Sequence, residues 1–367
     1  MSPKKRKADI SVNAARRGED LVIAVNRPLT GHGTIGSFID YIFDGAPDKI
    51  IAMAKRCKII MGPADGIAAG GKTLDNGVPF SVSGGGAEPD ALVDGFTSFL
   101  FVNFFAPAKL AGVEINASDE PSDEPSDGPA DGPSDAALDY SGIKFGVEYE
   151  DDFIAVINKP AGVKIHSDGA GISYSLSDAV GRYFRKKSGR ARAYPVHRLD
   201  IGTSGLIVFA KDNITCAILD RAIFENRLLR RYIAVVEGAP AARCGVINLA
   251  IGRHRHNSNR YRVSKTGKTA VTNYKVIKTD RRRNISFIEA SLATGRTHQI
   301  RVHFSHIGFP LAGDTLYGGR PLESGGFYAS TSGADKGREF LLHSSYLYFI
   351  HPYTKKIVEL NSPPDFM

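Results

Sequence analysis

A repeated acidic segment divides this chain of 367 residues into two parts. Residues 118–136 read SDEPSDEPSDGPADGPSDA, with seven acidic residues, no Lys or Arg and no large apolar side chain. Such a segment cannot bury enough apolar surface to offset its ordering entropy, and its prolines and like charges keep it extended. We therefore predict a disordered linker over 118–136, between an N-terminal module (1–117) and a C-terminal domain (143–367).

The positive charge of the protein is concentrated in the C-terminal domain. The whole chain has a formal net charge of +8, whereas residues 143–367 alone contain 34 Lys and Arg against 19 Asp and Glu. A domain this basic either binds a polyanion such as nucleic acid or has only a soluble basic surface. We favour nucleic acid.

Composition also limits where the protein acts. No run of about 18 apolar residues occurs, so we expect no membrane association. The basic start at 1–7 (MSPKKRK) is not followed by an apolar core, as a secretory signal would require. Cys57, Cys216 and Cys244 are too widely spaced for a disulfide framework or a metal pair. We expect a cytoplasmic protein, or a nuclear one if the SPKKRK run acts as an import signal.

The apolar pattern of the C-terminal domain predicts many short strands and few helices. Apolar runs predict strands at 153–157, 206–210, 232–236, 270–277 and 285–290. Helical spacing appears at 176–185 and again after Asn213, a candidate N-cap. This mixture indicates an α+β fold rather than a regular βαβ wind. In the N-terminal module we expect a helical stretch within 35–58 and strands at 58–61 and 78–83.

Residues 66–73 (GIAAGGKT) match the residue pattern of a phosphate-binding loop but lack its expected structural context. That loop needs a helix starting at its Lys-Thr, so that backbone N–H groups point at the phosphates. Here LDNGVP follows at 74–79, and Asn-Gly with a nearby Pro favours a turn. We therefore do not favour a nucleotide hydrolase, which would lose its ATP turnover in Lys72→Ala.

A polar tetrad precedes one of the predicted strands. His197-Arg198-Leu199-Asp200 leads into Gly-Thr-Ser-Gly at 202–205 and then into the apolar run 206–210. Small residues allow close backbone approach, and a loop braced by a buried strand is well placed for a site. Alternatively, Asp200 caps the turn by accepting backbone N–H groups. The residues alone leave both interpretations open.

A second polar cluster lies at 294–304 (TGRTHQIRVHF). Thr297 is predicted to cap a helix with an apolar stripe of Ile300, Phe304 and Ile307, and with His298, Arg301 and His306 on its other face. Arg296, beside a Gly, can reach a phosphate or a carboxylate.

Two further features fit nucleic acid. Tyr232 lies in a predicted strand and is either a core residue or a ring that stacks on a base. Residues 251–283 contain eleven Lys and Arg with a single acid, Asp280. That segment is a candidate phosphate-contacting surface.

Seven motifs occur in order across nearly all of 143–367, and together they resemble the RluA-type pseudouridine synthases. They are NKPAG at 158–162 followed by His166, HRLDIGTSGLIVFAK at 197–211, RRYIAVVEG at 230–238, GKTAVTNY at 267–274, TGRTHQIRVH at 294–303, GDTLYGG at 313–319 and LLHSSYLYFIHP at 341–352.

The resemblance implies an enzyme that isomerises uridine in RNA to pseudouridine. It implies the family's α+β fold, with a central, mostly antiparallel mixed sheet flanked by helices and an RNA-binding cleft. Asp200 would be the catalytic nucleophile, Arg296 its cationic partner, and Tyr232 the residue that holds the target base. No metal or cofactor is expected, because the reaction needs neither redox chemistry nor hydrolysis.

The resemblance also implies residues that contact RNA or the base. Arg198 would fill the space that the target uridine vacates, or form a salt bridge within its loop, and Leu342 would pack beneath the base. His197, Lys268, Arg301 and His298 complete the expected RNA-binding set. Residues 35–83 are loosely compatible with a small N-terminal RNA-binding module.

The expected partner is therefore RNA. We expect large-subunit ribosomal RNA first and transfer RNA as the alternative, in a monomer that requires no protein partner. A non-catalytic RNA-binding protein on the same fold is the rival function, which would bind RNA without forming pseudouridine.

Overall fold

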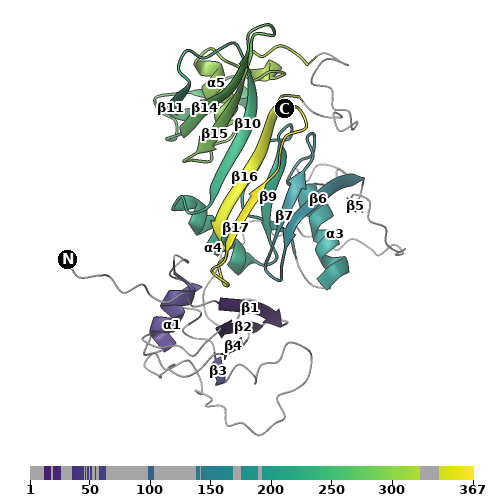
Figure 1. Cartoon of the computed structure of the whole chain (residues 1–367), viewed down its shortest axis with the longest axis vertical. Coiled ribbons are helices and arrows are strands. Elements are labelled where there is room, and N and C mark those ends of the chain that lie inside the picture. The colour runs from purple at the N-terminus through teal and green to yellow at the C-terminus, as the bar shows by residue number, and fades with distance from the viewer. Residues whose placement is uncertain are drawn as a thin grey trace, which may run out of the picture. The chain divides into compact units, whose positions relative to one another are not determined.

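A computed structural model describes residues 12–17, 20–25, 35–44, 46, 48, 50–51, 54, 58–62, 98–102, 138–140, 142–167, 175–188, 192–322 and 339–367 (Figure 1). The chain forms two compact units. The first comprises Met1–Pro129, Asp212–Ala222 and Ile350–Ile357, and the second comprises Ala130–Lys211, Ile223–Phe349 and Val358–Met367. The acidic linker, the SPKKRK run, residues 66–73 and the strand expected at 78–83 lie outside the described residues.

The first unit contains a four-stranded antiparallel sheet and helix α1 (Ile35–Ile42). The strand order is β1 (Val12–Arg17), β2 (Asp20–Val25), β4 (Ser98–Val102) and β3 (Lys58–Gly62). The expected strand at 58–61 is thus confirmed. Two segments from later in the chain belong to this unit: Arg16 lies 3.5 Å from Asp212, and the Phe43 ring packs edge-on against Tyr353. The compact unit is therefore not a continuous stretch of 1–117.

The second unit is built on an eleven-stranded sheet. Along its main path the order is β11-β14-β15-β10-β16-β9-β7-β6-β5, with β17 added beside β16 and β8 beside β9. The strands are β5 (Leu138–Tyr140), β6 (Ile143–Glu150), β7 (Ile154–Lys159), β8 (Tyr194–Pro195), β9 (Ser204–Ala210), β10 (Leu229–Glu237), β11 (Cys244–Asn248), β14 (Val271–Asp280), β15 (Ile285–Leu292), β16 (Leu342–Ile350) and β17 (Ile357–Asn361).

The pairing along this path is antiparallel everywhere except between β9 and β16, which run parallel. In that pair, His343 lies opposite Ser204 and Ser344 lies opposite Gly205. A separate two-stranded hairpin, β12 (Ile251–His254) and β13 (Asn257–Val263), leaves the sheet after β11. The expected α+β fold with a mostly antiparallel mixed sheet is confirmed.

Helices α3 (Leu176–Ser188) and α5 (Gln299–His306) cover one face of this sheet. Phe184 of α3 and Phe304 of α5 belong to the same buried cluster as Phe209 of β9 and Ala234 of β10. In Figure 1, α3 lies beside β6 and β7, and α5 beside β14 and β15. Strand β9 is buried along its entire length, because side chains cover both faces of the sheet there.

The strands and helices predicted after the linker are found, but two helix starts differ from expectation. Helix α4 (Asn213–Phe224) is capped by Asp212, whose Oδ1 accepts the Thr215 N–H at 2.7 Å, so Asn213 is not the N-cap. Helix α5 begins at Gln299 after His298, which has no side-chain cap bond, so Thr297 as a cap is also wrong. Of the described helices, none is long and apolar enough to cross a membrane.

Gly205 is required where β9 meets β16. Its φ of +102° lies in the left-handed region, and an added Cβ would lie within van der Waals distance of the Ser344 carbonyl oxygen and 2.7 Å from the Ser344 nitrogen. Because both atoms are backbone, they cannot move aside without separating the strands. We expect Gly205→Ala to lower the free energy of unfolding by about 3 kcal/mol, as measured by urea denaturation.

Gly308→Ala is the matched control for this prediction. Gly308 has a φ of +86°, but an added Cβ there would meet nothing within 4 Å. Its substitution should lower the free energy of unfolding by the backbone strain alone, about 1 kcal/mol. Equal losses in the two variants would contradict the steric role of Gly205.

Candidate active site

Asp200 lies in the loop between β8 and β9, and Lys159 at the end of β7 supports that loop. Lys159 Nζ donates to the carbonyl oxygens of Pro160 at 2.9 Å, Ile201 at 3.0 Å and Thr203 at 2.7 Å. The side chain is only 1% exposed. Burial lowers the pKa of Lys159 to about 7, against the opposing attraction of Asp200. Two of these bonds hold the backbone that directly follows Asp200, and the third joins it to the loop after β7.

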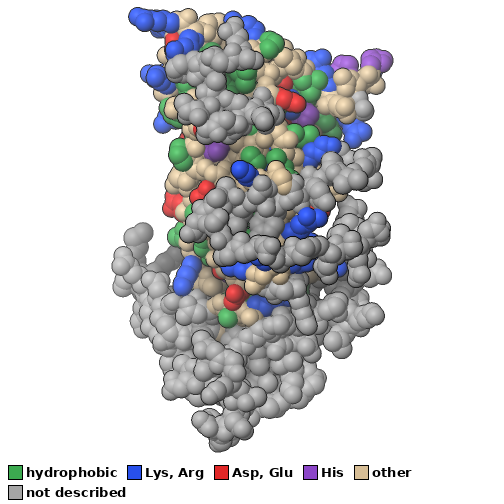
Figure 2. Space-filling view, turned by 90° about the vertical axis from the view of Figure 1, so that its right-hand side faces the viewer, with side chains coloured by type: hydrophobic (Ala, Val, Ile, Leu, Met, Phe, Trp, Pro, Cys, Tyr) green, Lys and Arg blue, Asp and Glu red, His purple; other side chains and the backbone are tan. Residues whose placement is uncertain are grey.

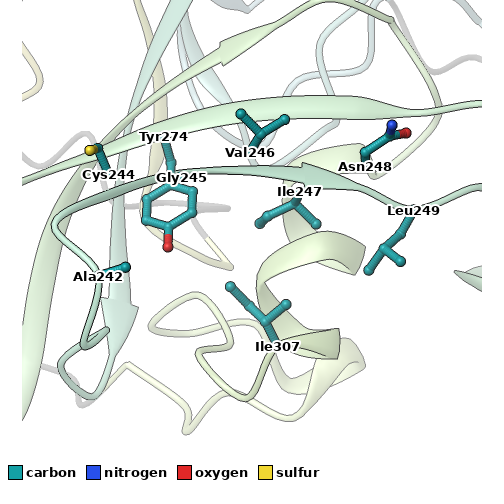
Figure 3. Close-up of a pocket in the computed structure, with 9 residues that line it drawn as sticks. All are labelled: Ala242, Cys244, Gly245, Val246, Ile247, Asn248, Leu249, Tyr274 and Ile307. Atoms are coloured by element: carbon teal, nitrogen blue, oxygen red, sulfur yellow. The ribbon is translucent and has the colours of Figure 1, made fainter.

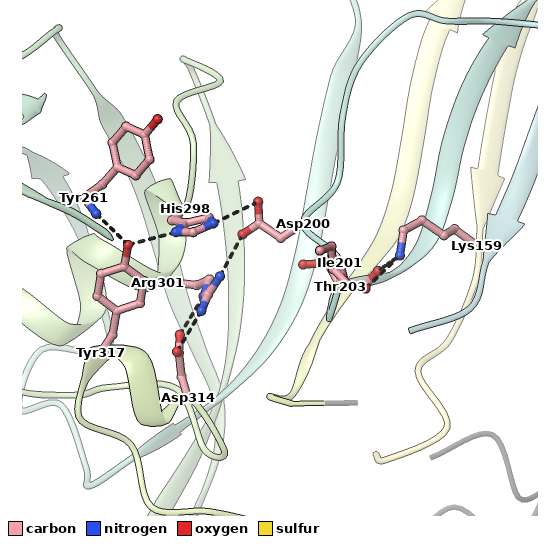
Figure 4. A network of polar contacts seen from close by, with 9 residues as sticks. All are labelled: Lys159, Asp200, Ile201, Thr203, Tyr261, His298, Arg301, Asp314 and Tyr317. Atoms are coloured by element: carbon pink, nitrogen blue, oxygen red, sulfur yellow. Dashed lines mark hydrogen bonds and ion pairs between the residues drawn. The ribbon is translucent and has the colours of Figure 1, made fainter. Parts of the chain in front are cut away.

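The carboxylate of Asp200 faces two nitrogen-bearing side chains of the α5 region. Arg301 Nη1 lies 3.5 Å from Oδ2, and His298 Nε2 lies 3.9 Å from Oδ1 (Figure 4). The side chain of Asp200 remains 16% exposed. In the turn itself, the Asp200 main-chain oxygen accepts the Thr203 N–H at 3.0 Å. The described contacts thus direct the carboxylate towards a cation and leave part of it accessible.

Arg301 is held by a buried ion pair. Its Nε and Nη2 donate to Asp314 at 2.7 and 2.9 Å, and its guanidinium lies over the rings of Tyr317 and Phe340. Burial alone would lower the pKa of Arg301, but Asp314 and Asp200 raise it above its ordinary value. Arg301 is therefore a permanent positive charge beside Asp200.

The structure brings Arg301, not Arg296, to Asp200. Arg296 is exposed, and its Nε donates to the main-chain oxygen of Thr269 at 2.9 Å. Arg301 was expected on the outward face of its helix, but it is buried. Because Asp314, Tyr317 and Phe340 cover Arg301, the solvent face of α5 is narrower than the sequence pattern suggests.

His298 joins the site through a strained backbone and a hydrogen bond to a tyrosine. Its φ is 55°, and its Nδ1 lies 2.8 Å from the hydroxyl oxygen of Tyr317. Burial lowers the pKa of His298, and the attraction of Asp200 only partly offsets this. Near neutral pH the imidazole is therefore uncharged and has one N–H group.

Tyr232 lies on β10, opposite Ser344 of β16. It is buried, and burial raises the pKa of its hydroxyl; Arg230 opposes the shift, and the negative charge of Asp200 adds to it. Leu342 of β16 is buried in the same apolar cluster as Tyr232. The two side chains named for the base therefore share one cluster.

The remaining residues expected to contact RNA differ in their exposure to solvent. His197 is buried, and its Nε2 accepts the Val208 N–H at 3.2 Å. Burial and Arg230 lower its pKa well below the ordinary value, so it is a neutral ring that supports β9. Arg198 and Lys268 are exposed and stay candidates for RNA contact.

Sequence reasoning gave no role to three residues of this region: Lys159, Asp314 and Tyr317. All three lie within quoted motifs, Lys159 in NKPAG, and Asp314 and Tyr317 in GDTLYGG. Asp314 is a buried acid, and such a residue requires a cation nearby. That requirement was the available signal for the pairing with Arg301.

An open pocket occurs elsewhere, along β11 (Figure 3). It is lined by Ala242, residues 244–249, Tyr274 of β14 and Ile307, which follows α5. None of these residues is among the described contacts of Asp200.

Comparison with known proteins identifies the family. The family model described as RNA pseudouridylate synthase matches residues 153–306. The chain is 38% identical over 215 residues to a Bacillus subtilis protein called uncharacterized RNA pseudouridine synthase YhcT. The matched region covers 59% of this chain and 67% of that protein. The chain is 36% identical over 220 residues to ribosomal large subunit pseudouridine synthase D of Buchnera aphidicola, covering 59% and 69%.

A solved structure also aligns, that of human RNA Pseudouridylate Synthase Domain Containing 4, with a TM-score of 0.48 and 24% identity over 60% of this chain and 90% of that one. The similarity in sequence extends over about two thirds of the two bacterial relatives, and the match to the family model includes the loop of Asp200 and helix α5. The chain belongs to the RNA pseudouridine synthase family.

Proposed function

We propose that this enzyme converts specific uridines of large-subunit ribosomal RNA to pseudouridine, with Asp200 as its nucleophile. The observation that carries the proposal is the Asp200 carboxylate itself, which is partly exposed and lies 3.5 Å from the buried cation Arg301. A relative of 36% identity is named for the ribosomal large subunit, and this supports the choice of RNA.

The reaction moves the attachment of the uracil ring from N1 to C5. The bond between N1 and the sugar breaks, the ring turns, and C5 bonds to the sugar carbon while C5 loses its hydrogen and N1 gains one. Asp200 would attack the sugar or the base, or assist proton removal at the sugar. Because atoms are rearranged within one nucleotide, no oxidant or reductant is consumed.

The positive charge of Arg301 supports this role for Asp200. A nucleophilic carboxylate must be ionised, and an opposite charge within about 4 Å favours the ionised form. Arg301 is itself fixed by two bonds to Asp314, so it does not have to be ordered when substrate binds.

The target uridine has to leave the RNA stack to reach Asp200. We propose that Tyr232 holds the base, with Leu342 in the same apolar cluster beneath it. Exposed Arg198, two residues before Asp200, would occupy the space that the base leaves in the RNA.

A basic surface would hold the RNA strand. Ten of the eleven Lys and Arg residues within 251–283 are exposed: Arg253, Arg255, Arg262, Lys265, Lys268, Lys275, Lys278, Arg281, Arg282 and Arg283. Figure 2 shows Lys and Arg side chains gathered at the upper edge of the described surface, with histidines at its upper right. Phosphate contacts of this kind give affinity without sequence preference.

Mapping pseudouridines in ribosomal and transfer RNA of cells with and without this protein tests the proposal. We expect at least one pseudouridine of large-subunit ribosomal RNA to disappear, and to return with the wild-type protein but not with Asp200→Asn. Loss confined to transfer RNA would overturn the ribosomal assignment. Restoration by Asp200→Asn would overturn the role of Asp200.

A further inference from the structure

A chain of polar contacts leads from the hairpin β12–β13 to Asp200 (Figure 4). The main-chain N–H of Tyr261 on β13 donates to the hydroxyl oxygen of Tyr317 at 2.9 Å. That hydroxyl lies 2.8 Å from His298 Nδ1, and His298 Nε2 lies 3.9 Å from Asp200 Oδ1. Tyr261 and Tyr317 are therefore linked to the Asp200 carboxylate through His298.

The Asp200 carboxylate favours one order of donors and acceptors in this chain. Because the oxygen of Tyr317 already accepts the N–H of Tyr261, its own proton is available for His298 Nδ1. With Nδ1 as acceptor, the ring proton of His298 lies on Nε2, the nitrogen that faces Asp200. The opposite tautomer would turn a lone pair towards the carboxylate, which is electrostatically unfavourable.

The imidazole is fixed from both sides by aromatic rings. The rings of Tyr261 and Tyr317 each lie 5.7 Å from that of His298, in edge-to-face arrangements. Burial lowers the pKa of His298; Asp200 and Asp314 oppose this, while Arg301 and Arg198 reinforce it. The ring is thus a neutral donor with one orientation.

The backbone of His298 is also held in place. A φ of 55° is unfavourable for a residue with a Cβ, and such strain persists only where neighbouring bonds enforce it. The next residue, Gln299, supplies those bonds: its Oε1 accepts from the Thr294 hydroxyl and the Arg296 N–H, and its Nε2 donates to the main-chain oxygen of Val271 and the hydroxyl of Thr272.

Asp200 therefore faces a different donor with each carboxylate oxygen, Arg301 with Oδ2 and His298 with Oδ1. Arg301 alone leaves the carboxylate free to rotate about its last bond. The Nε2 of His298 lies too far from Oδ1 for a hydrogen bond, but the dipole of its N–H group favours the rotation that turns Oδ1 towards it. We propose that His298 and Tyr317 are positioning residues that fix the rotation of the Asp200 carboxylate and couple it to the hairpin β12–β13. This inference rests on the proposal that Asp200 is the nucleophile.

Tyr317→Phe tests the inference by removing one hydroxyl and keeping the ring. We expect kcat to fall about 10-fold or more, because His298 is no longer held to one tautomer and one orientation. The Kd for RNA should change by less than about twofold, since no phosphate contact is lost. Tyr346→Phe is the matched control, because it removes an exposed hydroxyl that bonds Glu359. Its kcat should equal that of the wild type.

A double-mutant cycle separates positioning from a purely structural role. His298→Asn keeps a side chain that tolerates the left-handed backbone. If Tyr317 acts through His298, Tyr317→Phe should lower kcat no further in the His298→Asn background. Should Tyr317→Phe fail to fold, His298→Asn alone decides: a lower kcat at unchanged Kd supports the inference, and an unchanged kcat overturns it.

The outcomes distinguish this inference from the function on which it rests. An active wild type with unchanged kcat in Tyr317→Phe, a loss in RNA affinity alone, or additive losses in the cycle would overturn the positioning role. A wild type that forms no pseudouridine would overturn the proposed function, and this inference with it.

Discussion

Asp200→Asn is expected to lower the rate of pseudouridine formation by roughly 10⁴-fold or more, the scale seen when an enzyme loses its nucleophile. The amide has nearly the shape of the carboxylate, but it has no negative charge with which to attack. The fold should survive, because Arg301 keeps its two bonds to Asp314. Single-turnover rates with purified RNA measure the effect.

RNA binding by Asp200→Asn should stay close to that of the wild type, because the substitution leaves the basic surface intact. Asp152→Asn provides the matched control, since it removes one negative charge from an exposed turn. We expect wild-type activity in that variant. A rate in Asp200→Asn above about 1% of wild type would be inconsistent with a nucleophilic role.

The second large effect concerns Arg301. In Arg301→Met, Asp314 would be left in the interior without a cation, and breaking a buried pair in this way costs about 3–5 kcal/mol. Asp200 would also lose the positive charge that lies 3.5 Å from its carboxylate. We expect lower stability in urea denaturation and a loss of activity of at least about 100-fold.

A double variant distinguishes these two roles of Arg301. Adding Asp314→Leu to Arg301→Met removes the orphaned charge, so most of the lost stability should return. Activity should not return, because Asp200 still lacks its cation. Recovery of activity together with stability would show that Arg301 serves only the fold.

Much of the fold could be predicted because its strands are continuous apolar runs. The strands predicted at 153–157, 206–210 and 232–236 appear in the structure as β7, β9 and β10. The parallel contact between β9 and β16 could not be predicted in this way. It joins residues 139 apart in sequence, and apolar periodicity contains no information about which strands pair.

The candidate site was predicted in part, for a comparable reason. The motifs predicted Asp200 as the nucleophile and Arg296 as its cationic partner, whereas the structure places Arg301 beside the carboxylate. That placement depends on where α5 starts, and the start depends on the four side-chain bonds of Gln299 rather than on Thr297. The contact of Tyr317 with His298 likewise exists only in three dimensions.

The most direct test of the central claim uses RNA with tritium at C5 of its uridines. Joining C5 to the sugar must release that hydrogen, so tritium appears in water only if the isomerisation takes place. We expect the purified wild-type protein to release tritium in a one-to-one ratio with the pseudouridine formed, and Asp200→Asn to release none. RNA that binds to the wild type without releasing tritium would contradict the account.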